Sequence, residues 1–582
     1  MMAAEQQLNR GILEDLCTAV EHERSQVLAK ATEWRVIKNA VLRPGNNRAA
    51  LLKAEDIDEQ LTEGSTTLIR IDGKEFAAEV VGMAFGELEL LIKDCDLAGG
   101  LTFEFRVPFD DYLTSLYDFL RAQALEVVGD SFPRRSLALA NAVVLPHYER
   151  NEAGYRVSYV MGAPGSGKTE ALVSKALKLV GTGMNDMRVM IVTYTNAAAD
   201  VIYGRLALRV GDKPDVQLTR LGLTEASIEI EQRACSENVN STMSISQAME
   251  SNLTVTTAYR ALMCAKKELG THSFVLFDEA STLPISLAWA TSLIATERIT
   301  LYGDPFQLGP IVQSDPLREH TVRQRFGTSP FEIEGVMTAA EEEQGQVVLR
   351  GQYRLPSALA NAMCPPLYKS AGNTSRNSMS EPESPWGVGS FLFINSSSHD
   401  ATCEKFMNSR RNEIHADLVV KLVGALLEQE IVEPHEIAKS LLIITPYRAQ
   451  RSLISRRLNA KGWIPLTQIR ALVTTVHRAQ GSEREYVIFD VTEAPNSDKS
   501  TYFPVGRLWN GEGWQSDGSR LLTTALTRAR KQALVLLHRE YIGKSSAGGK
   551  ADMGALHRLN AGLDKWGALA TFKPESLDSR ES

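Results

Sequence analysis

The pattern of apolar and polar positions divides the chain into stretches of different character. From about residue 8 to residue 41, apolar residues recur near helical spacing, which predicts a helical N-terminal region over residues 1–63. Over residues 64–109 the pattern changes to short alternating runs separated by turns such as Asp72-Gly73 and Gly99-Gly100. This spacing predicts a small β-barrel or sandwich. A helical pattern returns over residues 110–150, where we expect a stalk or linker.

From Val157 onward, apolar strands alternate with helical stretches, a pattern typical of an α/β fold with a mostly parallel sheet. The pattern breaks near residue 340 and resumes from Gly389 to His538. We therefore expect two tandem α/β domains, over residues 151–345 and 346–543. Residues 544–582 are expected to form a C-terminal tail, flexible near its Gly/Ser/Lys-rich start.

The amino-acid composition indicates a globular protein but does not indicate what reaction it catalyses. The 582 residues are 43% hydrophobic and 23% charged, which is ordinary globular composition and excludes a mostly disordered, collagenous or coiled-coil chain. Lysine and arginine number 63 against 71 acidic residues, for a net charge of −8. A nucleic-acid ligand would therefore need a local basic channel, because the overall field is not cationic.

The cysteines and the apolar runs bear on location and metals. The six cysteines form no CxxC and no Cys/His zinc spacing, so we expect no zinc and a reducing compartment. The first residues lack the apolar core of a signal peptide, and no apolar run is long enough to span a membrane. We expect an intracellular protein, cytoplasmic or nuclear, without membrane association.

A predicted strand over residues 155–161 runs into a glycine-rich loop that is followed by an amphipathic helix up to Val180. The loop fits the GxxxxGK[ST] pattern of a phosphate-binding P-loop in its strand–loop–helix setting. Its glycines let backbone N–H groups point at phosphate oxygens, while Lys168 would reach the β- and γ-phosphates and Thr169 would hold Mg²⁺. The predicted nucleotide-binding residues of this loop are Gly162, Pro164, Gly165, Ser166, Gly167, Lys168 and Thr169.

Two later strands are expected to bring acidic and amide groups to the same edge of the sheet. The apolar run at 274–277 ends in Asp278-Glu279, where Asp278 suits the magnesium shell and Glu279 suits polarisation of the attacking water. The run at 299–302 is followed by Gln307, whose amide can hydrogen-bond a γ-phosphate or that water. With Lys168, these residues form the predicted catalytic set of this domain.

In their order along residues 155–540, these and further segments resemble the motifs of superfamily 1 helicases, and most closely those of the Upf-like branch. The matching segments are GAPGSGKT (162–169), TYTNAAAD (193–200), VTT (255–257), DEAS (278–281), GDPFQL (303–308), QYRLP (352–356), ITPYRAQ (444–450), TVHRAQGSE (475–483) and ALTRAR (525–530). The plan is also similar to that of helicases of positive-strand RNA viruses, although the cysteine-rich zinc module of their nidovirus members has no counterpart here. Two departures are His477, where the branch usually has Asp, and Thr523-Thr524 before Ala525.

The resemblance implies a fold and a set of roles. The fold would be two tandem RecA-like domains preceded by a β-barrel accessory domain on helical stalks, with ATP and Mg²⁺ between the RecA-like domains. Arg354 and Arg528, both expected in the second domain, would neutralise charge on the γ-phosphate. Tyr353 would stack on the base, and Gln480, Gly481 and Glu483 would couple the nucleotide to domain closure. Single-stranded nucleic acid would be held by Thr195, Asn196, Thr257, Thr445 and Thr475.

One family feature is missing. The branch usually carries a glutamine upstream of the P-loop that reads adenine, but the stretch at 134–141 has none, and Gln123 lies further back. We therefore expect other nucleoside triphosphates to be accepted beside ATP.

The resulting hypothesis is an ATP-dependent helicase or translocase on single-stranded RNA or DNA, moving 5′→3′ by family analogy. Two alternatives stay open. One is an ATP-dependent clamp or ribonucleoprotein remodeller that separates no duplex, and the other is a P-loop NTPase acting as a regulatory switch. The sequence determines neither the kind of strand nor the pathway, and it gives no information on protein partners.

Overall fold

The computed structural model describes residues 2–32, 35–37, 41–44, 50–55, 66–84, 87–92, 103–105, 112–128, 134–144, 157–181, 187–210, 213, 215–311, 327–333, 346–365, 368, 382–406, 409–496, 503, 514, 516–544 and 553–571. The chain forms two compact units. Unit 1 comprises Met1–Ser25, Asp111–Arg354 and Pro365–Ser375, and unit 2 comprises Gln26–Asp110, Leu355–Cys364 and Arg376–Ser582.

Unit 1 is built around an eight-stranded sheet in which every pair of neighbouring strands is parallel. Its order is β11-β10-β12-β9-β13-β14-β8-β15. The strands are β8 (Val157–Gly162), β9 (Val189–Thr193), β10 (Leu218–Leu221), β11 (Val239–Thr242), β12 (Leu253–Thr257), β13 (His272–Phe277), β14 (Ala295–Gly303) and β15 (Gln346–Leu349). Strands β9 and β12 are buried along their whole length, as expected of a parallel sheet covered by helices.

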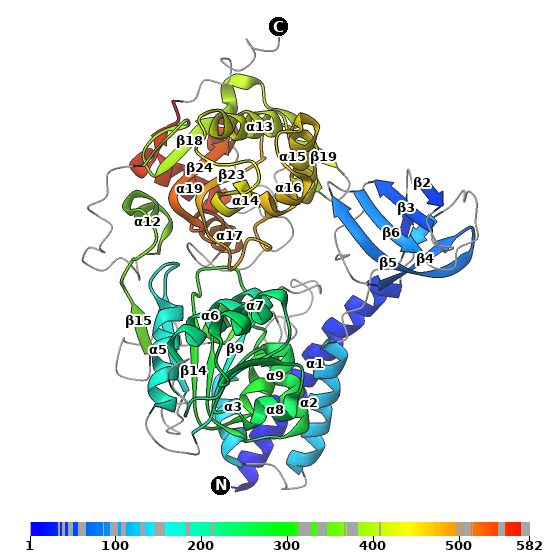
Figure 1. Cartoon of the computed structure of the whole chain (residues 1–582), viewed down its shortest axis with the longest axis vertical. Coiled ribbons are helices and arrows are strands. Elements are labelled where there is room, and N and C mark those ends of the chain that lie inside the picture. The colour runs from blue at the N-terminus through cyan, green and yellow to red at the C-terminus, as the bar shows by residue number, and fades with distance from the viewer. Residues whose placement is uncertain are drawn as a thin grey trace. The chain divides into compact units, whose positions relative to one another are not determined.

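The helices that follow these strands are α5 (Lys168–Val180), α6 (Asn196–Val210), α7 (Glu225–Ala234), α8 (Ile245–Glu250), α9 (Ala258–Lys267) and α10 (Ile285–Ser292). The apolar stripe of α5, Leu172, Val173 and Ala176, is buried in the core of this unit. The alternation of strands and helices predicted an α/β fold, and the structure has one (Figure 1).

The predicted domain boundary at residue 345 is displaced. Strand β15 pairs with β8 in parallel, so residues 346–349 complete the first sheet instead of starting the second domain. The sequence around β15 does not indicate which sheet it joins, because β15 pairs with a strand far away in sequence. As a result, Gln352, Tyr353 and Arg354 belong to unit 1.

Among the described residues before the P-loop, three helices belong to unit 1 wholly or in part: α1 (Met2–Thr32), α2 (Tyr112–Val128) and α3 (Arg134–Val144). Arg24 of α1 donates to Thr114 Oγ1 of α2 (3.0 Å). Asn141 of α3 donates to Asn9 Oδ1 (2.5 Å) and accepts from Trp289 Nε1 (2.9 Å), and its side chain is buried. These contacts fix the helices against α10.

A seven-stranded antiparallel sheet occupies residues 35–105, in the order β1-β7-β4-β5-β6-β3-β2. Its strands are β1 (Arg35–Ile37), β2 (Val41–Pro44), β3 (Ala50–Glu55), β4 (Thr66–Ile71), β5 (Lys74–Ala84), β6 (Glu87–Ile92) and β7 (Phe103–Phe105). The predicted turn at Asp72-Gly73 joins β4 to β5, and both residues have positive φ, which is typical of a tight hairpin turn. Arg70 pairs with Glu75 (2.8 Å) and Glu104 (3.3 Å) across this sheet.

One expectation for this region needs correction, and a second is not confirmed. Residues 35–37, 41–44 and 50–55 form strands, although the sequence pattern assigned residues 1–63 to a helical region, because β1 pairs with β7 and β3 with β6 from much later in the chain. Closure of the sheet into a barrel is not seen among the pairings described, where β1 and β2 stand at opposite ends of the strand order.

The second α/β domain lies in unit 2 and has a six-stranded parallel sheet in the order β22-β21-β23-β24-β18-β25. The strands are β18 (Phe391–Asn395), β21 (Leu441–Thr445), β22 (Val473–Thr475), β23 (Arg484–Asp490), β24 (Ala529–Leu537) and β25 (Ala568–Leu569). The helices are α12 (Ser357–Met363), α13 (Glu413–Glu428), α14 (Ile437–Ser440), α15 (Arg448–Lys461), α16 (Leu466–Leu472), α17 (Asp517–Leu526), α18 (Arg539–Lys544) and α19 (Met553–Trp566). Two hairpins form separate two-stranded sheets: β16 (Glu383–Ser384) with β17 (Gly387–Val388), and β19 (Glu404–Phe406) with β20 (Ser409–Arg411).

The expectation of a tail over residues 544–582 is wrong for its middle part. Helix α19 carries a buried apolar stripe of Ala555, Leu556, Leu559 and Leu563, and β25 extends the second sheet beside β18. The Gly/Ser/Lys-rich stretch before α19 masked this stripe in the sequence pattern. The predicted flexible stretch near 544–550 lies outside the described residues after Lys544.

Within the described part of the chain, no helix is long and apolar enough to cross a membrane. The same residues contain no cluster of three or more His, Cys, Asp or Glu side chains arranged to hold a metal ion.

Candidate functional site

The glycine-rich loop between β8 and α5 has a backbone that other residues could adopt only with strain. Gly165 and Gly167 have φ values of 80° and 90°. A Cβ added at Gly162 would lie 2.3 Å from Ser166 Oγ, and one at Gly165 would lie 2.6 Å from the Cβ of Arg354. The loop is thus packed closely both on itself and by the segment after β15, and it opens into the N-terminus of α5 as a phosphate-binding loop requires.

Lys168, the first residue of α5, has its ammonium group turned into this loop. Its Nζ donates to the carbonyl oxygens of Gly162 (2.6 Å) and Ala163 (3.1 Å). Burial lowers the pKa of Lys168, and the nearby carboxylates of Asp304 and Asp278 oppose that shift. The ammonium is therefore held where loop carbonyls and acidic groups partly replace water.

Thr169 and Asp278 lie together as the predicted metal site requires. Thr169 Oγ1 donates to Asp278 Oδ2 (3.2 Å), and Asp278 Oδ1 accepts from the backbone N–H of Glu279 (3.1 Å). Burial raises the pKa of Asp278, while Lys168 and these hydrogen bonds lower it. A hydroxyl and one carboxylate fit Mg²⁺, which takes few protein ligands and fills its shell with water and phosphate oxygens.

Glu279 has an unusual backbone. It has φ 51°, in the left-handed region that non-glycine residues seldom adopt, and it precedes the short helix at Ala280–Thr282. Its carbonyl accepts from both the N–H and the hydroxyl of Thr282 (2.9 Å each). Such a conformation costs roughly 1 kcal/mol or more and persists where the surroundings impose it, often at a functional site.

Gln307 lies beside a carboxylate that the sequence analysis did not select, Asp304. Asp304 follows β14, between β13 and β8 in the sheet, and is 1% exposed. Its Oδ2 accepts from Gln307 Nε2 (2.9 Å), and its Oδ1 accepts from the N–H of Phe306 (3.1 Å) and the hydroxyl of Tyr368 (2.9 Å). The available signal was the position of Asp304 directly after a buried strand, the same position as Asp278 after β13.

The segment at Gln352–Arg354 contacts the P-loop directly. Gln352 Nε2 donates to the carbonyl of Pro164 (2.9 Å), and the N–H of Tyr353 donates to the carbonyl of Gly165 (2.9 Å). The Tyr353 ring approaches Gly167 and is 62% exposed. Arg354 is close enough to Lys168 to lower its pKa.

This placement corrects the expectation that Arg354 lies in the second domain, because its own segment extends the first sheet. Gln352 was not singled out as a site residue, since its contact with Pro164 joins segments remote in sequence.

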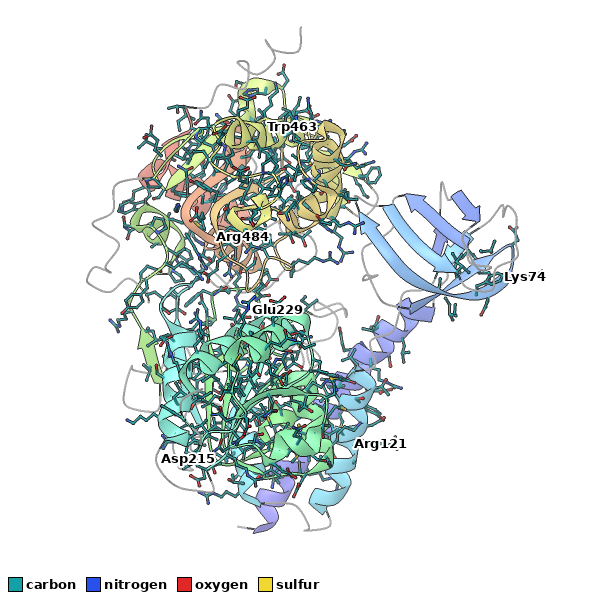
Figure 2. The ribbon with its side chains drawn as sticks, in the orientation of Figure 1. Lys74, Arg121, Asp215, Glu229, Trp463 and Arg484 are labelled. Carbon is teal, nitrogen blue, oxygen red and sulfur yellow. The ribbon has the colours of Figure 1, made fainter. Side chains whose placement is uncertain are left out.

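Unit 2 contains the residues that were predicted to couple the bound nucleotide to domain closure, and also Arg528. Arg528 is buried, and it donates from Nε to the carbonyl of Thr524 (2.9 Å) and from Nη1 to that of Ser482 (3.4 Å). Glu483 pairs with Arg530 (3.0 Å). Arg484, labelled in Figure 2, donates from Nη1 to the carbonyl of Glu483 (2.8 Å).

The loop at 476–481 brings Gln480 and Gly481 to the same region, and Gly481 has φ 78°. The structure therefore brings Gln480, Gly481, Glu483 and Arg528 into one neighbourhood of unit 2, at the start of β23 and the end of α17.

Three of the predicted strand-binding residues are in unit 1, each at or beside the N-terminus of a helix that follows a strand. Thr195 and Asn196 are exposed before and at the start of α6, while Thr257 is 8% exposed before α9. Asn196 Oδ1 accepts from Arg220 Nη2 (3.0 Å), and Arg220 is itself buried and paired with Asp200 (2.9 Å). Because Arg220 can only donate, the oxygen of the Asn196 amide faces inward and its NH₂ group faces outward.

The other two predicted strand-binding residues differ from each other. Thr475 is 9% exposed at the end of β22, but Thr445 is fully buried and its Oγ1 lies 3.0 Å from that of Thr492. A direct phosphate contact by the Thr445 side chain does not fit this burial. Thr492, with φ 68°, was missed by sequence reasoning and is held by hydrogen bonds to Asp490 and Asn412.

Two family models match the chain over the two α/β domains. The "UvrD/REP helicase N-terminal domain" matches residues 151–307, and the "AAA domain" model matches residues 332–540. Their joint order is that of a two-domain P-loop NTPase, with the P-loop, Asp278 and Gln307 in the first model's range.

Curated relatives agree with that class. The chain is 24% identical over 396 residues to the "DNA replication ATP-dependent helicase/nuclease JHS1" of Arabidopsis thaliana, covering 65% of this chain and 27% of the relative. It is 24% identical over 487 residues to the "DNA replication ATP-dependent helicase/nuclease DNA2" of Gallus gallus, covering 81% of this chain and 43% of the relative. The chain thus spans less than half the length of either relative. Among solved structures, "Arterivirus nonstructural protein 10 (helicase)" matches at 14% identity over 84% of this chain and 77% of that one, but a TM-score of 0.36 supports no argument.

The fold and the matching ranges define the class as a P-loop NTPase with two parallel α/β domains. Within that class, the two family models and the curated relatives support similarity to the superfamily 1 helicases of the Upf-like branch.

Proposed function

We propose that this chain is an ATP-dependent helicase or translocase that moves on single-stranded nucleic acid. The observation that carries the proposal is the convergence of Lys168, Thr169, Asp278, Glu279 and Gln307 at the carboxyl edge of β8, β13 and β14. Similarity to a helicase branch then favours coupling of hydrolysis to strand movement over hydrolysis alone.

Within this site each side chain has one chemical task. Lys168 and the loop N–H groups would hold the β- and γ-phosphates, and Glu279 would orient the attacking water. Thr169 and Asp278 would hold Mg²⁺, which when bound neutralises charge on the phosphate oxygens. Gln307 would hydrogen-bond the γ-phosphate or that water.

Arginines would stabilise the charge that develops during transfer. Arg354 is next to the P-loop within unit 1 and affects the pKa of Lys168, which supports a role for its guanidinium beside a bound triphosphate without movement of another domain. Arg528 would act from unit 2, together with Gln480, Gly481 and Glu483. The base would stack on Tyr353.

The strand would be held by groups that bind phosphates without reading bases. The outward NH₂ of Asn196, with Thr195, Thr257 and Thr475, suits that role because hydroxyl and amide donors contact the backbone of any sequence. The buried Thr445 would instead stabilise the carboxyl end of β21 through its contact with Thr492. RNA and DNA both remain candidates for the strand, and the antiparallel sheet of residues 35–105 is a candidate accessory domain for it.

The test is hydrolysis of ATP with single-stranded RNA and DNA homopolymers side by side, followed by strand separation on partial duplexes. We expect at least one homopolymer to stimulate hydrolysis, and strand separation to require hydrolysable ATP. Stimulation without strand separation would support a clamp or remodeller, and hydrolysis indifferent to polynucleotide would support a regulatory switch. Either result contradicts the proposal.

A further inference from the structure

Tyr368 is the most informative residue outside the predicted catalytic set. It follows α12 in a segment, Pro365–Ser375, that belongs to unit 1, although α12 itself belongs to unit 2. Its side chain is buried, and its ring packs edge-on against Phe306 with centroids 5.7 Å apart. The hydroxyl donates to Asp304 Oδ1 (2.9 Å).

Asp304 is the centre of a short hydrogen-bonded chain. Its Oδ1 takes the Tyr368 hydroxyl and its Oδ2 takes Gln307 Nε2, while its own N–H donates to Ser281 Oγ (3.3 Å) in the loop that carries Asp278 and Glu279. A carboxylate that is 1% exposed needs such donors, because burial without them is costly. The N–H of Phe306 also donates to Oδ1 (3.1 Å), so the carboxylate orientation depends on Tyr368 together with this backbone contact.

The same chain determines how Gln307 is oriented. A carboxylate oxygen only accepts hydrogen bonds, so the nitrogen of the Gln307 amide must be the end that faces Asp304. One amide hydrogen is then engaged, and the Oε1 end is turned the other way. The direction of this amide decides what it offers to a γ-phosphate or a water, and a rotated carboxylate would release it.

We propose that Tyr368 is a positioning residue for ATP hydrolysis, which holds Asp304 in the orientation that aims the Gln307 amide at the reacting groups. Tyr368 touches neither nucleotide nor metal in this role and acts only through Asp304 and Gln307. The inference rests on the proposed ATP hydrolysis at this site.

Tyr368→Phe is the direct variant, because it removes the hydroxyl and keeps the ring on Phe306. The matched control is Tyr203→Phe, since Tyr203 is also buried in unit 1 and its hydroxyl has no hydrogen-bond partner among the described residues. We expect kcat for ATP with saturating single-stranded homopolymer to fall about five- to tenfold in Tyr368→Phe, with the KM for ATP and the Kd for ADP within twofold of the parent. Tyr203→Phe should leave kcat unchanged.

A double-variant cycle separates positioning from a general effect on packing. In a Gln307→Ala background, the hydroxyl of Tyr368 has no amide left to aim, so adding Tyr368→Phe should lower kcat no further. A folding defect would instead lower kcat equally in both backgrounds, which would overturn the proposal. An unchanged kcat in Tyr368→Phe, with an active parent, would also overturn it. A parent chain whose hydrolysis ignores every homopolymer would contradict the proposed helicase function instead.

Discussion

The half-buried Lys168 and the buried carboxylates of Asp278 and Asp304 form a set of opposite charges at the P-loop. Burial lowers the pKa of Lys168 and raises that of Asp278, and each is opposed by the other's charge. Asp304 is the acidic neighbour with the largest effect on Lys168. Such charges are tolerated in a protein interior only as a mutually neutralising set, so loss of one leaves the others uncompensated. Substitutions that remove one of these three charges are therefore poor probes of chemistry, and an isosteric change at a residue outside the set is a better one.

Glu279→Gln is such a variant, because Gln keeps the shape and hydrogen-bonding length of the side chain. We expect kcat for ATP to fall roughly 100-fold or more, since the amide cannot act as a base toward the attacking water, while nucleotide binding is retained. The measurement is steady-state hydrolysis beside ADP binding. Glu229→Gln, on the exposed surface of α7, is the control and should behave like the parent. Near-normal turnover of Glu279→Gln would remove Glu279 from its proposed role.

Base selectivity is a second property decided by single residues. Two amides upstream of the P-loop were candidates for reading adenine, Asn141 and Gln123. The side chain of Asn141 is hydrogen-bonded to Trp289 and Asn9, and that of Gln123 is buried on α2. Stacking on Tyr353 then remains as the base contact, and every base can stack. An amide pairing with adenine would discriminate by about 1–3 kcal/mol, by analogy with bidentate contacts in DNA readout.

We therefore expect GTP, CTP and UTP to be hydrolysed within about tenfold of ATP, given that this 1–3 kcal/mol contact is missing. The measurement is kcat/KM for the four nucleotides under one set of conditions. Tyr353→Ala should raise the KM for all four by a similar factor. A strict preference for ATP would mean that a residue other than Gln123 and Asn141 reads the base.

At the scale of elements, the sequence predicted those parts whose signals are local. The P-loop is a contiguous pattern, and the alternation of strands and helices is repeated along the chain, so both could be predicted. Strands β1 and β15 could not, because each is short and gains its identity from a partner far away in sequence. The contacts of Gln352 with Pro164 and of Tyr368 with Asp304 escaped prediction for the same reason. Helix α19 was not predicted, because the polar composition of the stretch before it indicated a tail.

Helix α19 was expected to lie in a tail but is partly buried. Its burial leads to a separate prediction about stability. Leu559 is 1% exposed and lines the same small pocket as Ala362, Met363 and Leu522. Leu559→Ala should lower the free energy of unfolding of unit 2 by about 2–5 kcal/mol, as buried leucine truncations do. Urea unfolding of the full chain, followed by far-UV circular dichroism, should show part of the transition at lower urea. Leu569→Ala, at an exposed position of β25, is the matched control, and equal behaviour of the two variants would mean that α19 contributes no core.

For the whole molecule, direction of movement is the property that no single side chain determines. A nucleic-acid strand has a polarity, and the groups proposed to hold it in each domain are hydroxyls and amides that bind its phosphates in either sense. Polarity must therefore come from the order in which the two domains grip and release the strand during each ATP cycle. Similarity to the Upf-like branch predicts 5′→3′ movement. Duplexes with only a 5′ or only a 3′ single-stranded overhang test this, at equal overhang length and with Glu279→Gln as the inactive control. We expect strand separation from the 5′ overhang to be at least several-fold faster, and preference for the 3′ overhang would show that this chain departs from its branch in how the two domains alternate.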